Sequence, residues 1–131
     1  MEKRFINPTP WLQELQLNHG VEVRDARRTL YLSGQTATAA DGAVMHPGDL
    51  LAQFRLAWKN LKDALEMADM GPTNIVRLNI YTTDVDGFMA AAETVSATFA
   101  KEGAQPVATL LGVARLFEPN VLIELEATAA A

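Results

Sequence analysis

The period of the hydrophobic pattern changes at Gly71-Pro72, and this change restricts the folds that the chain can adopt. Before it, five large apolar residues recur at alternating steps of three and four, which is one face of an amphipathic α-helix. Asp49 stands at the N-cap position, and Gly71-Pro72 ends the helix. From Asn74 to Tyr81, apolar and polar residues alternate as in a half-buried strand. The helical face consists of Leu51, Phe54, Trp58, Leu61 and Leu65.

Shorter patterns on either side complete the order of elements. A second helix begins at Asp84 or Asp86 and ends at Gly103. The order is strands, helix, strand, helix, strand, strand. Both helices can pack on one face of one mixed β-sheet, which predicts an α+β, two-layer sandwich. The other strands are predicted near Lys3–Ile6, His19–Val23 and Thr29–Ser33, and at Ala108–Leu116 and Val121–Thr128.

The length and composition indicate a single globular domain over residues 1–131. A chain of this length needs no disulfide or metal to stabilise its core. The absence of cysteine excludes disulfide scaffolds, thiolate zinc sites and cysteine nucleophiles. A two-layer fold leaves one face of its sheet uncovered. Because 49% of the residues are hydrophobic, we expect that face to pack against another subunit.

The charge balance argues against a nucleic-acid partner. The chain has 11 basic and 16 acidic residues, a formal charge of −5, whereas phosphate backbones are bound by basic surfaces. No apolar stretch has the length of a bilayer span, and Met1-Glu2-Lys3-Arg4 is not followed by an apolar run of signal-peptide length. We therefore expect a soluble, cytoplasmic protein that does not bind membranes.

The two histidines give no indication of a metal site. His19 and His46 lie in different segments, without a carboxylate at helical spacing, whereas metal ligands are expected in a tighter cluster. His46 is interpreted as a loop residue before proline, and His19 as a surface or edge residue at the start of a strand. The glycines form neither a dinucleotide-binding loop nor a P-loop, and no nucleophile elbow of the GxSxG type is present.

Two acidic residues of the last strand are the first candidates for chemistry. Glu124 and Glu126 share one face of that strand, opposite Val121, Ile123 and Leu125. On a central strand, such carboxylates must be paired or lie in a cleft, where a raised pKa would suit proton transfer. On an edge strand, they would form a solvent-facing acidic row. Pattern alone leaves both readings open.

Two further features can be read in two ways. Ser33-Gly34-Gln35 ends a strand with a hydroxyl, a flexible backbone position and an amide. This group could bind a small polar ligand, but many strand ends have such a composition. Arg115 follows the next-to-last strand and is either the charge partner of one of the acidic residues or a surface residue.

Four stretches, taken in order, resemble the Rid family, the YjgF-type proteins often labelled reactive intermediate or imine deaminases. The match runs from about residue 19 to residue 128. The resemblance implies a chorismate-mutase-like α+β fold and a homotrimer with three clefts, each between neighbouring subunits. The matching stretches are Leu30–Gln35, Gln53–Ala68, Ile75–Asp84, and Val113–Leu116 together with Ile123–Ala127.

The resemblance also implies an activity. Rid deaminases hydrolyse short-lived enamine or imine acids to keto acids and ammonia, without a cofactor. In their cleft an arginine clamps the substrate carboxylate, and a glutamate of the last strand positions the attacking water. Carried over by position, the glutamate is Glu124, the serine of the third strand is Ser33, and a family tyrosine falls at about His19.

The family arginine is missing from this chain. Counted back from Val113–Leu116, its position is Ala108, and the position two further on, often cysteine in the family, is Leu110. Both residues face the same side of their strand, so the resemblance implies a more apolar cleft without a carboxylate clamp. Arg115 belongs to a separate arginine-leucine pair. We therefore do not expect efficient turnover of 2-imino acids.

Two hypotheses about function follow. The first is a Rid-like hydrolase of a small enamine or imine, whose substrate lacks an α-carboxylate; Glu124 activates water, and Ser33 and Gln35 orient the substrate. The second is a non-catalytic, homotrimeric protein that binds a small ligand or acts in protein interactions, which Ala108 and Leu110 favour. An endoribonuclease, an older label in the family, is disfavoured by the charge of −5.

Overall fold

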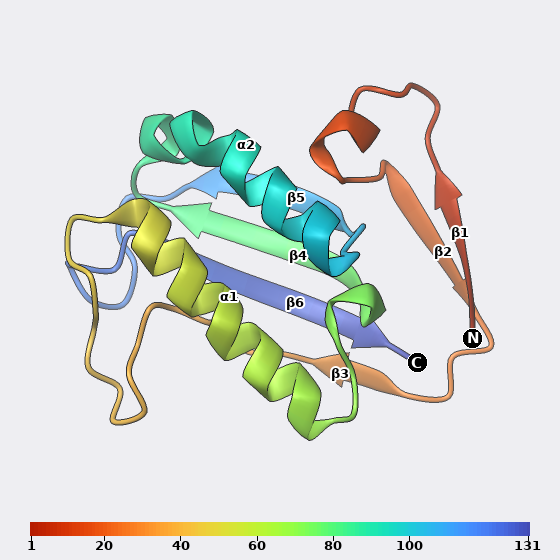
Figure 1. The fold of residues 1–131 in the computed structure, drawn as a ribbon, viewed down its shortest axis with the longest axis horizontal. Coiled ribbons are helices and arrows are strands. Elements are labelled where there is room, and N and C mark those ends of the chain that lie inside the picture. The colour runs from red at the N-terminus through yellow and green to blue at the C-terminus, as the bar shows by residue number, and fades with distance from the viewer.

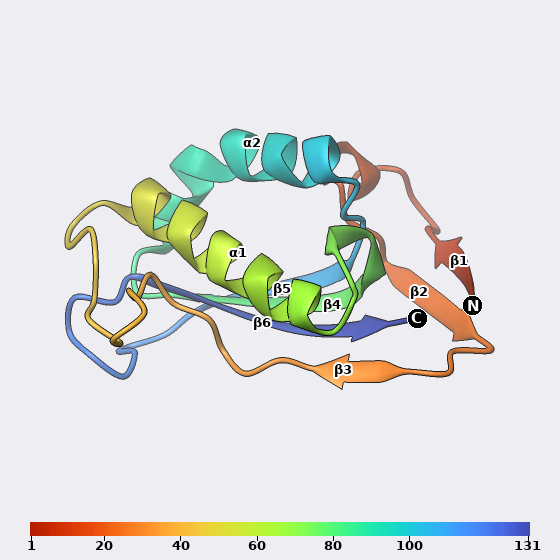
Figure 2. The same ribbon diagram turned by 60° about the horizontal axis from the view of Figure 1, so that its bottom comes forward.

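Two α-helices cover one face of a four-stranded sheet in the computed structural model, which describes residues 1–131 (Figure 1). The strand order is β3-β6-β4-β5; β4 and β5 are parallel, and the other two pairs are antiparallel. Figure 2 shows both helices on one side of this sheet. The predicted α+β sandwich is therefore confirmed. The elements are β3 (Thr29–Tyr31), α1 (Leu50–Met67), β4 (Ile75–Thr82), α2 (Val85–Glu102), β5 (Val107–Gly112) and β6 (Ile123–Ala130).

The first two strands differ from the prediction of one sheet. β1 (Glu2–Ile6) and β2 (Gly20–Arg24) pair only with each other, as a separate antiparallel sheet. The break lies in the charged turn that follows β2. Asp25 adopts a positive φ of 56° there, and the backbone N–H groups of Arg27 and Arg28 donate to the carbonyl of Ala131. The chain thus changes direction, and only β3 joins the larger sheet.

Both helices begin at an expected aspartate, and α2 ends where predicted, but α1 ends at Met67, before Gly71-Pro72, which instead opens a short 3-10 turn. The Asp49 side chain accepts a hydrogen bond from the N–H of Ala52, and that of Asp84 accepts one from Gly87. Such caps satisfy N–H groups that the first turn leaves free. α2 ends at Gly103, whose φ of 74° suits glycine. Neither helix combines the length and apolar character needed to cross a membrane.

The strand ends show where sequence patterns mislead. β5 ends at Gly112, although the apolar pattern continues to Leu116, because its partner β4 ends at Thr82 and leaves nothing to pair with. β3 ends at Tyr31, and pairing with β6 resumes at Gln35. The amides of Leu32 and Gln35 donate to the carbonyls of Ala127 and Leu125, so this strand contains one residue more than its partner. The extra residue forms a bulge at Ser33-Gly34.

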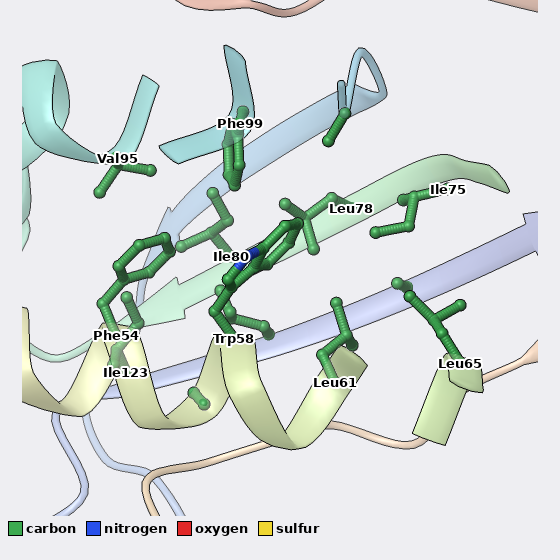
Figure 3. Packing of buried hydrophobic residues seen from close by; sticks show 14 of the residues in the cluster. Phe54, Trp58, Leu61, Leu65, Ile75, Leu78, Ile80, Val95, Phe99 and Ile123 are labelled. Carbon is green, nitrogen blue, oxygen red and sulfur yellow. The ribbon is translucent and has the colours of Figure 1, made fainter. Parts of the chain in front are cut away.

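The core lies between the helices and the sheet. In Figure 3, Phe54 and Trp58 of α1 point toward Phe99 of α2 and toward β4. The Trp58 and Phe99 ring centroids are 5.1 Å apart, and Phe54 and Phe99 meet edge to face. Leu78 and Ile80 of β4 complete this cluster and are almost fully buried. Four residues of the predicted helical stripe, Phe54, Trp58, Leu61 and Leu65, belong to this core, whereas Leu51 is half-buried and packs against it.

A buried glutamine of α1 fixes the approach to β6. Gln53 is fully buried, and its amide donates to the carbonyls of Met45, His46 and Asn120. Its side-chain oxygen accepts from the N–H of Leu122, one residue before β6. These four hydrogen bonds tie two loops to the helix and so position the strand that carries Glu124.

A candidate active site on the open face of the sheet

The two acidic residues of β6 lie on the face of the sheet that the helices do not cover. Glu124 and Glu126 are half-buried, whereas the alternate residues Ile123, Leu125 and Ala127 are buried on the helix side. β6 lies between β3 and β4, so it is a central strand. The interpretation as an edge strand is therefore wrong. The two carboxylates lie on the open face of a central strand, with a neighbouring strand on each side.

The carboxylate of Glu126 is held by two neighbours on β4. It accepts hydrogen bonds from the amide of Asn79 and from the hydroxyl of Tyr81, each at 3.0 Å. These bonds lower the pKa of Glu126, because they stabilise its charged form. The same contact raises the pKa of Tyr81. Glu126 is thus a fixed negative charge beside Glu124.

The carboxylate of Glu124 has a different environment. It makes no side-chain hydrogen bond, although Tyr81 lies directly across the ladder from it. Partial burial raises its pKa, and the neighbouring charge of Glu126 adds to the effect. The two carboxylates of this strand therefore differ in environment: that of Glu126 is hydrogen-bonded and has a lowered pKa, whereas that of Glu124 makes no side-chain hydrogen bond and has a raised pKa.

The bulge before Gln35 brings the backbone against Glu124. A Cβ atom at Gly34 would lie 1.9 Å from Oε1 of Glu124 and 2.6 Å from its carboxyl carbon. No residue except glycine fits there without displacing the carboxylate. The preceding Ser33 is exposed. Of the residues predicted for the site, the structure thus places Ser33 in the bulge beside Glu124.

The side chain of Gln35 lies on the other face. Gln35 stands opposite Leu125 in the ladder, and residues opposite each other share a face. Its amide donates to the carbonyl of Ser33 and lines a hollow beside Asn60 of α1. Within one chain it does not reach the space in front of Glu124. Gln35 contributes to this site only through its backbone, which pairs with Leu125.

His19 is part of the N-terminal segment. Its backbone N–H donates to Oδ1 of Asn7 at 3.0 Å, and its ring lies 3.3 Å from the same oxygen. The ring also meets Trp11 edge to face, with centroids 6.1 Å apart.

The structure contains no cluster of metal-binding side chains: no three His, Cys, Asp or Glu side chains are grouped so that they could hold a metal ion.

Ala108 and Leu110 lie on the helix side of the sheet. They stand opposite Leu78 and Ile80 of β4, which belong to the core. Both line a cavity of about 320 Å³ between β5, α2 and residues 11–17. Glu124 is on the opposite face of the same sheet. A cleft that contains Glu124 together with these residues therefore requires two chains.

Arg115 follows β5 and is exposed. It takes part in none of the four ion pairs of the structure. Within one chain it is a surface residue rather than the charge partner of Glu124 or Glu126.

Asn79 and Tyr81 were not among the residues predicted for the site. Their alternation with Leu78 and Ile80 assigns them to the polar face of β4. Their contact with Glu126 depends on the register between β4 and β6, which are over 40 residues apart in the chain. The alternation within a strand does not determine which residues of another strand it pairs with. The sequence could therefore predict the face on which Asn79 and Tyr81 lie, but not their contact with Glu126.

Comparison with known proteins identifies the family. The model of the family described as Endoribonuclease L-PSP matches residues 13–131. The RutC family protein UK114 of Drosophila melanogaster is 30% identical over 104 residues, which cover 79% of this chain and 73% of that protein. A Rattus norvegicus protein named 2-iminobutanoate/2-iminopropanoate deaminase is 30% identical over 102 residues, covering 78% and 72%.

Solved structures of similar proteins support the same family. The crystal structure of YyfB from Yersinia pestis, a Rid family protein of unknown function, covers 100% of both chains with a TM-score of 0.89 and 34% identity. The YjgF gene product of E. coli has a TM-score of 0.70 and 30% identity, covering 86% of each chain. The chain therefore belongs to the endoribonuclease L-PSP family, which is the family of the YjgF and Rid proteins.

Proposed function

We propose that this protein is a hydrolase that deaminates a small, reactive imine or enamine, with Glu124 as the residue that activates water. The observation that carries the proposal is the contrast between the two carboxylates of β6. Glu126 is fixed by Asn79 and Tyr81, whereas Glu124 is unpaired and has a raised pKa. Relatives from rat and mouse named 2-iminobutanoate/2-iminopropanoate deaminase support the reaction class.

The chemistry requires one residue that both accepts and donates a proton. With the imine in its protonated form, Glu124 accepts a proton from water as the oxygen adds to the C=N carbon, which gives a neutral carbinolamine. Glu124 then passes this proton to nitrogen, and as the C–N bond breaks it takes the proton of the carbinolamine hydroxyl, so that the carbonyl forms and ammonia leaves. A carboxyl group with a raised pKa suits both steps better than an ordinary glutamate does. Water and the imine are the only reactants, so the step needs no cofactor.

The proposed site is a cleft between two subunits of a homotrimer. Glu124 and Ser33 would come from one chain, and Ala108 and Leu110 from its neighbour, since a single chain holds them on opposite faces of the sheet. The open face also presents exposed apolar side chains: Tyr31 is 80% exposed and Leu111 49%. A neighbouring subunit that covers them would bury apolar surface and remove water from Glu124.

The substrate is proposed to lack an α-carboxylate. The cavity beside Ala108 and Leu110 contains no charged residue, and a carboxylate there would lose its hydration without gaining a partner. The test is ammonia release from freshly generated imines that differ only in the presence of the carboxylate. We expect faster turnover of the carboxylate-free imine; a strong preference for the 2-imino acid would contradict this substrate class.

A second candidate is a non-catalytic, trimeric protein that binds a small ligand. The uncharged cavity beside Ala108 and Leu110 favours it, because an apolar ligand can be bound there without proton transfer by Glu124. Absence of ammonia release with every imine, together with saturable ligand binding, would favour this candidate over the hydrolase.

A further inference from the structure

A polar hollow of about 440 Å³ lies between α1 and residues 35–40, the segment that follows β3. Figure 1 shows this segment running alongside α1. Four of the lining residues come from the helix and four from the segment, and none of them lines the cavity beside Ala108 and Leu110. The volume of the polar hollow is within the range of small-molecule sites, roughly 300–1,000 Å³.

The two sides of the polar hollow are held together by side-chain amides. The amide of Asn60 donates to the carbonyls of Thr36 and Thr38, each at 2.9 Å, and so ties the segment to α1. The amide of Gln35 donates to the carbonyl of Ser33 at 3.0 Å. These bonds fix the orientation of both amides, so the polar hollow is shaped by the fold.

The oxygens of these two amides remain available to a ligand. Both N–H groups of Asn60 are used, and the side-chain oxygens of Asn60 and Gln35 make no hydrogen bond within the chain. No fully buried side-chain polar atom lacks a partner, so these two oxygens are accessible. Amide oxygens only accept hydrogen bonds, and they therefore favour a ligand that carries N–H donors.

One cation and one anion complete the polar lining. Lys59 and Asp63 lie one turn apart on α1 and form an ion pair of 2.6 Å, with side chains that are 64% and 55% exposed. A pair so exposed to solvent contributes little to stability. A ligand with charges of both signs can therefore replace it at little cost. The two charges cancel, so the lining favours a ligand without net charge.

We propose that the polar hollow binds a small zwitterion of the class of α-amino acids with a short side chain. The ligand carboxylate pairs with Lys59, its ammonium group donates to Asp63 and to the amide oxygens, and its side chain lies against Ala39 and Ala40. A multiply charged anion would meet one cation and an opposing carboxylate. The site goes beyond the proposed function, because Glu124 does not line it.

The test is isothermal titration calorimetry at pH 7 and low ionic strength. The probes are L-alanine, L-lactate and L-alaninamide, which share a carbon skeleton. Lactate has a hydroxyl in place of the ammonium group, and alaninamide has an amide in place of the carboxylate. We expect saturable binding of alanine and at least about tenfold weaker binding of both analogues, because each loses one charged contact.

Two positions of α1 give a matched pair of variants. Lys59 lines the polar hollow, whereas Arg55, one turn earlier, is exposed and outside it. Lys59→Gln should abolish the saturable binding of alanine, and Arg55→Gln should retain it, with circular dichroism spectra to check the fold. Asp63→Asn removes the other charge and should weaken binding in the same way. Glu124→Gln should bind alanine as the wild type does.

Three results would overturn the proposal. The first is absence of saturable binding of alanine to the wild type, and the second is binding of lactate or alaninamide as tight as that of alanine. The third is unchanged affinity of Lys59→Gln; if Glu124→Gln then loses affinity, alanine binds in the cleft of the proposed function instead. Ammonia release is measured separately, so a failure of catalysis and a failure of binding are distinguishable.

Discussion

At the scale of single residues, the candidate site depends on an asymmetry between two glutamates of one strand. Asn79 and Tyr81 stabilise the charge of Glu126, and that charge together with burial destabilises the charge of Glu124. A residue that is destabilised in its ionised form is what general acid–base chemistry needs.

This asymmetry predicts opposite effects of two matched substitutions at neutral pH. The pKa of Glu124 is raised on folding, so the folded state loses stability as the pH rises through that raised value. Glu124→Gln should therefore raise the melting temperature at pH 7, by roughly 2–5 °C. The pKa of Glu126 is lowered, so its stabilisation is present at neutral pH and is lost on acidification. Glu126→Gln, which keeps an acceptor but loses the charge, should lower the melting temperature.

Thermal unfolding followed from pH 7 to pH 3 measures both variants. For both variants, the difference in melting temperature from the wild type should become smaller in acid, because the carboxyl groups are then protonated in the folded and unfolded states alike. Shifts of the same sign at pH 7 would contradict the assigned roles.

At the scale of elements, the bulge between β3 and β6 connects the fold with the site. It lets the chain pass Glu124 without a side chain between them, and it turns Ser33 toward the open face while Gln35 pairs with Leu125. Bulges commonly re-aim side chains next to active sites. The loops held by Gln53 fix the start of β6.

Replacement of Gly34 by alanine tests this role. The new Cβ would overlap Oε1 of Glu124, so we expect the carboxylate to move and turnover to fall by roughly tenfold or more, with the fold retained. Gly71→Ala is the control, because nothing lies within 4 Å of its added Cβ and its φ of −144° is open to alanine. The measurement is the rate of ammonia release by each variant, with a circular dichroism spectrum to check its fold. Equal activity of the two variants would exclude a positioning role for the bulge.

The elements were predictable where a local pattern determines them. The stripe of α1 and the alternation in β4 come from spacing alone, and the aspartate caps fix both helix starts. Pairing is not local, so the sequence did not reveal that β1 and β2 form their own sheet. For the same reason, Glu124 and its face were predictable, whereas its register with Tyr81 and the bulge at Gly34 were not.

At the scale of the whole molecule, the two faces of the sheet carry complementary features. The open face has the carboxylates and exposed apolar side chains, and the helix side has an uncharged cavity beside Ala108 and Leu110. The wall formed by residues 11–17 lacks a strong sequence pattern, so this cavity could not be foreseen. The proposed trimer would bring the two faces of neighbouring chains together.

This assembly predicts a specific sensitivity to charge on the open face. Leu111 of β5 is 49% exposed there, and Leu111→Arg would place an unpaired charge in a subunit interface. We expect the wild type to have three times the chain mass of 14.3 kDa and the variant to dissociate, as measured by light scattering after size-exclusion chromatography. A wild-type mass of one chain would exclude the shared cleft.

The central claim is that Glu124 activates water for deamination, and ammonia release by Glu124→Gln tests it most directly. The substrate is a freshly generated imine without a carboxylate, and the variant is first shown to have the same mass as the wild type. The account predicts that the wild type accelerates ammonia release and that the variant loses roughly a hundredfold or more of that rate. Equal rates for the two proteins would contradict it.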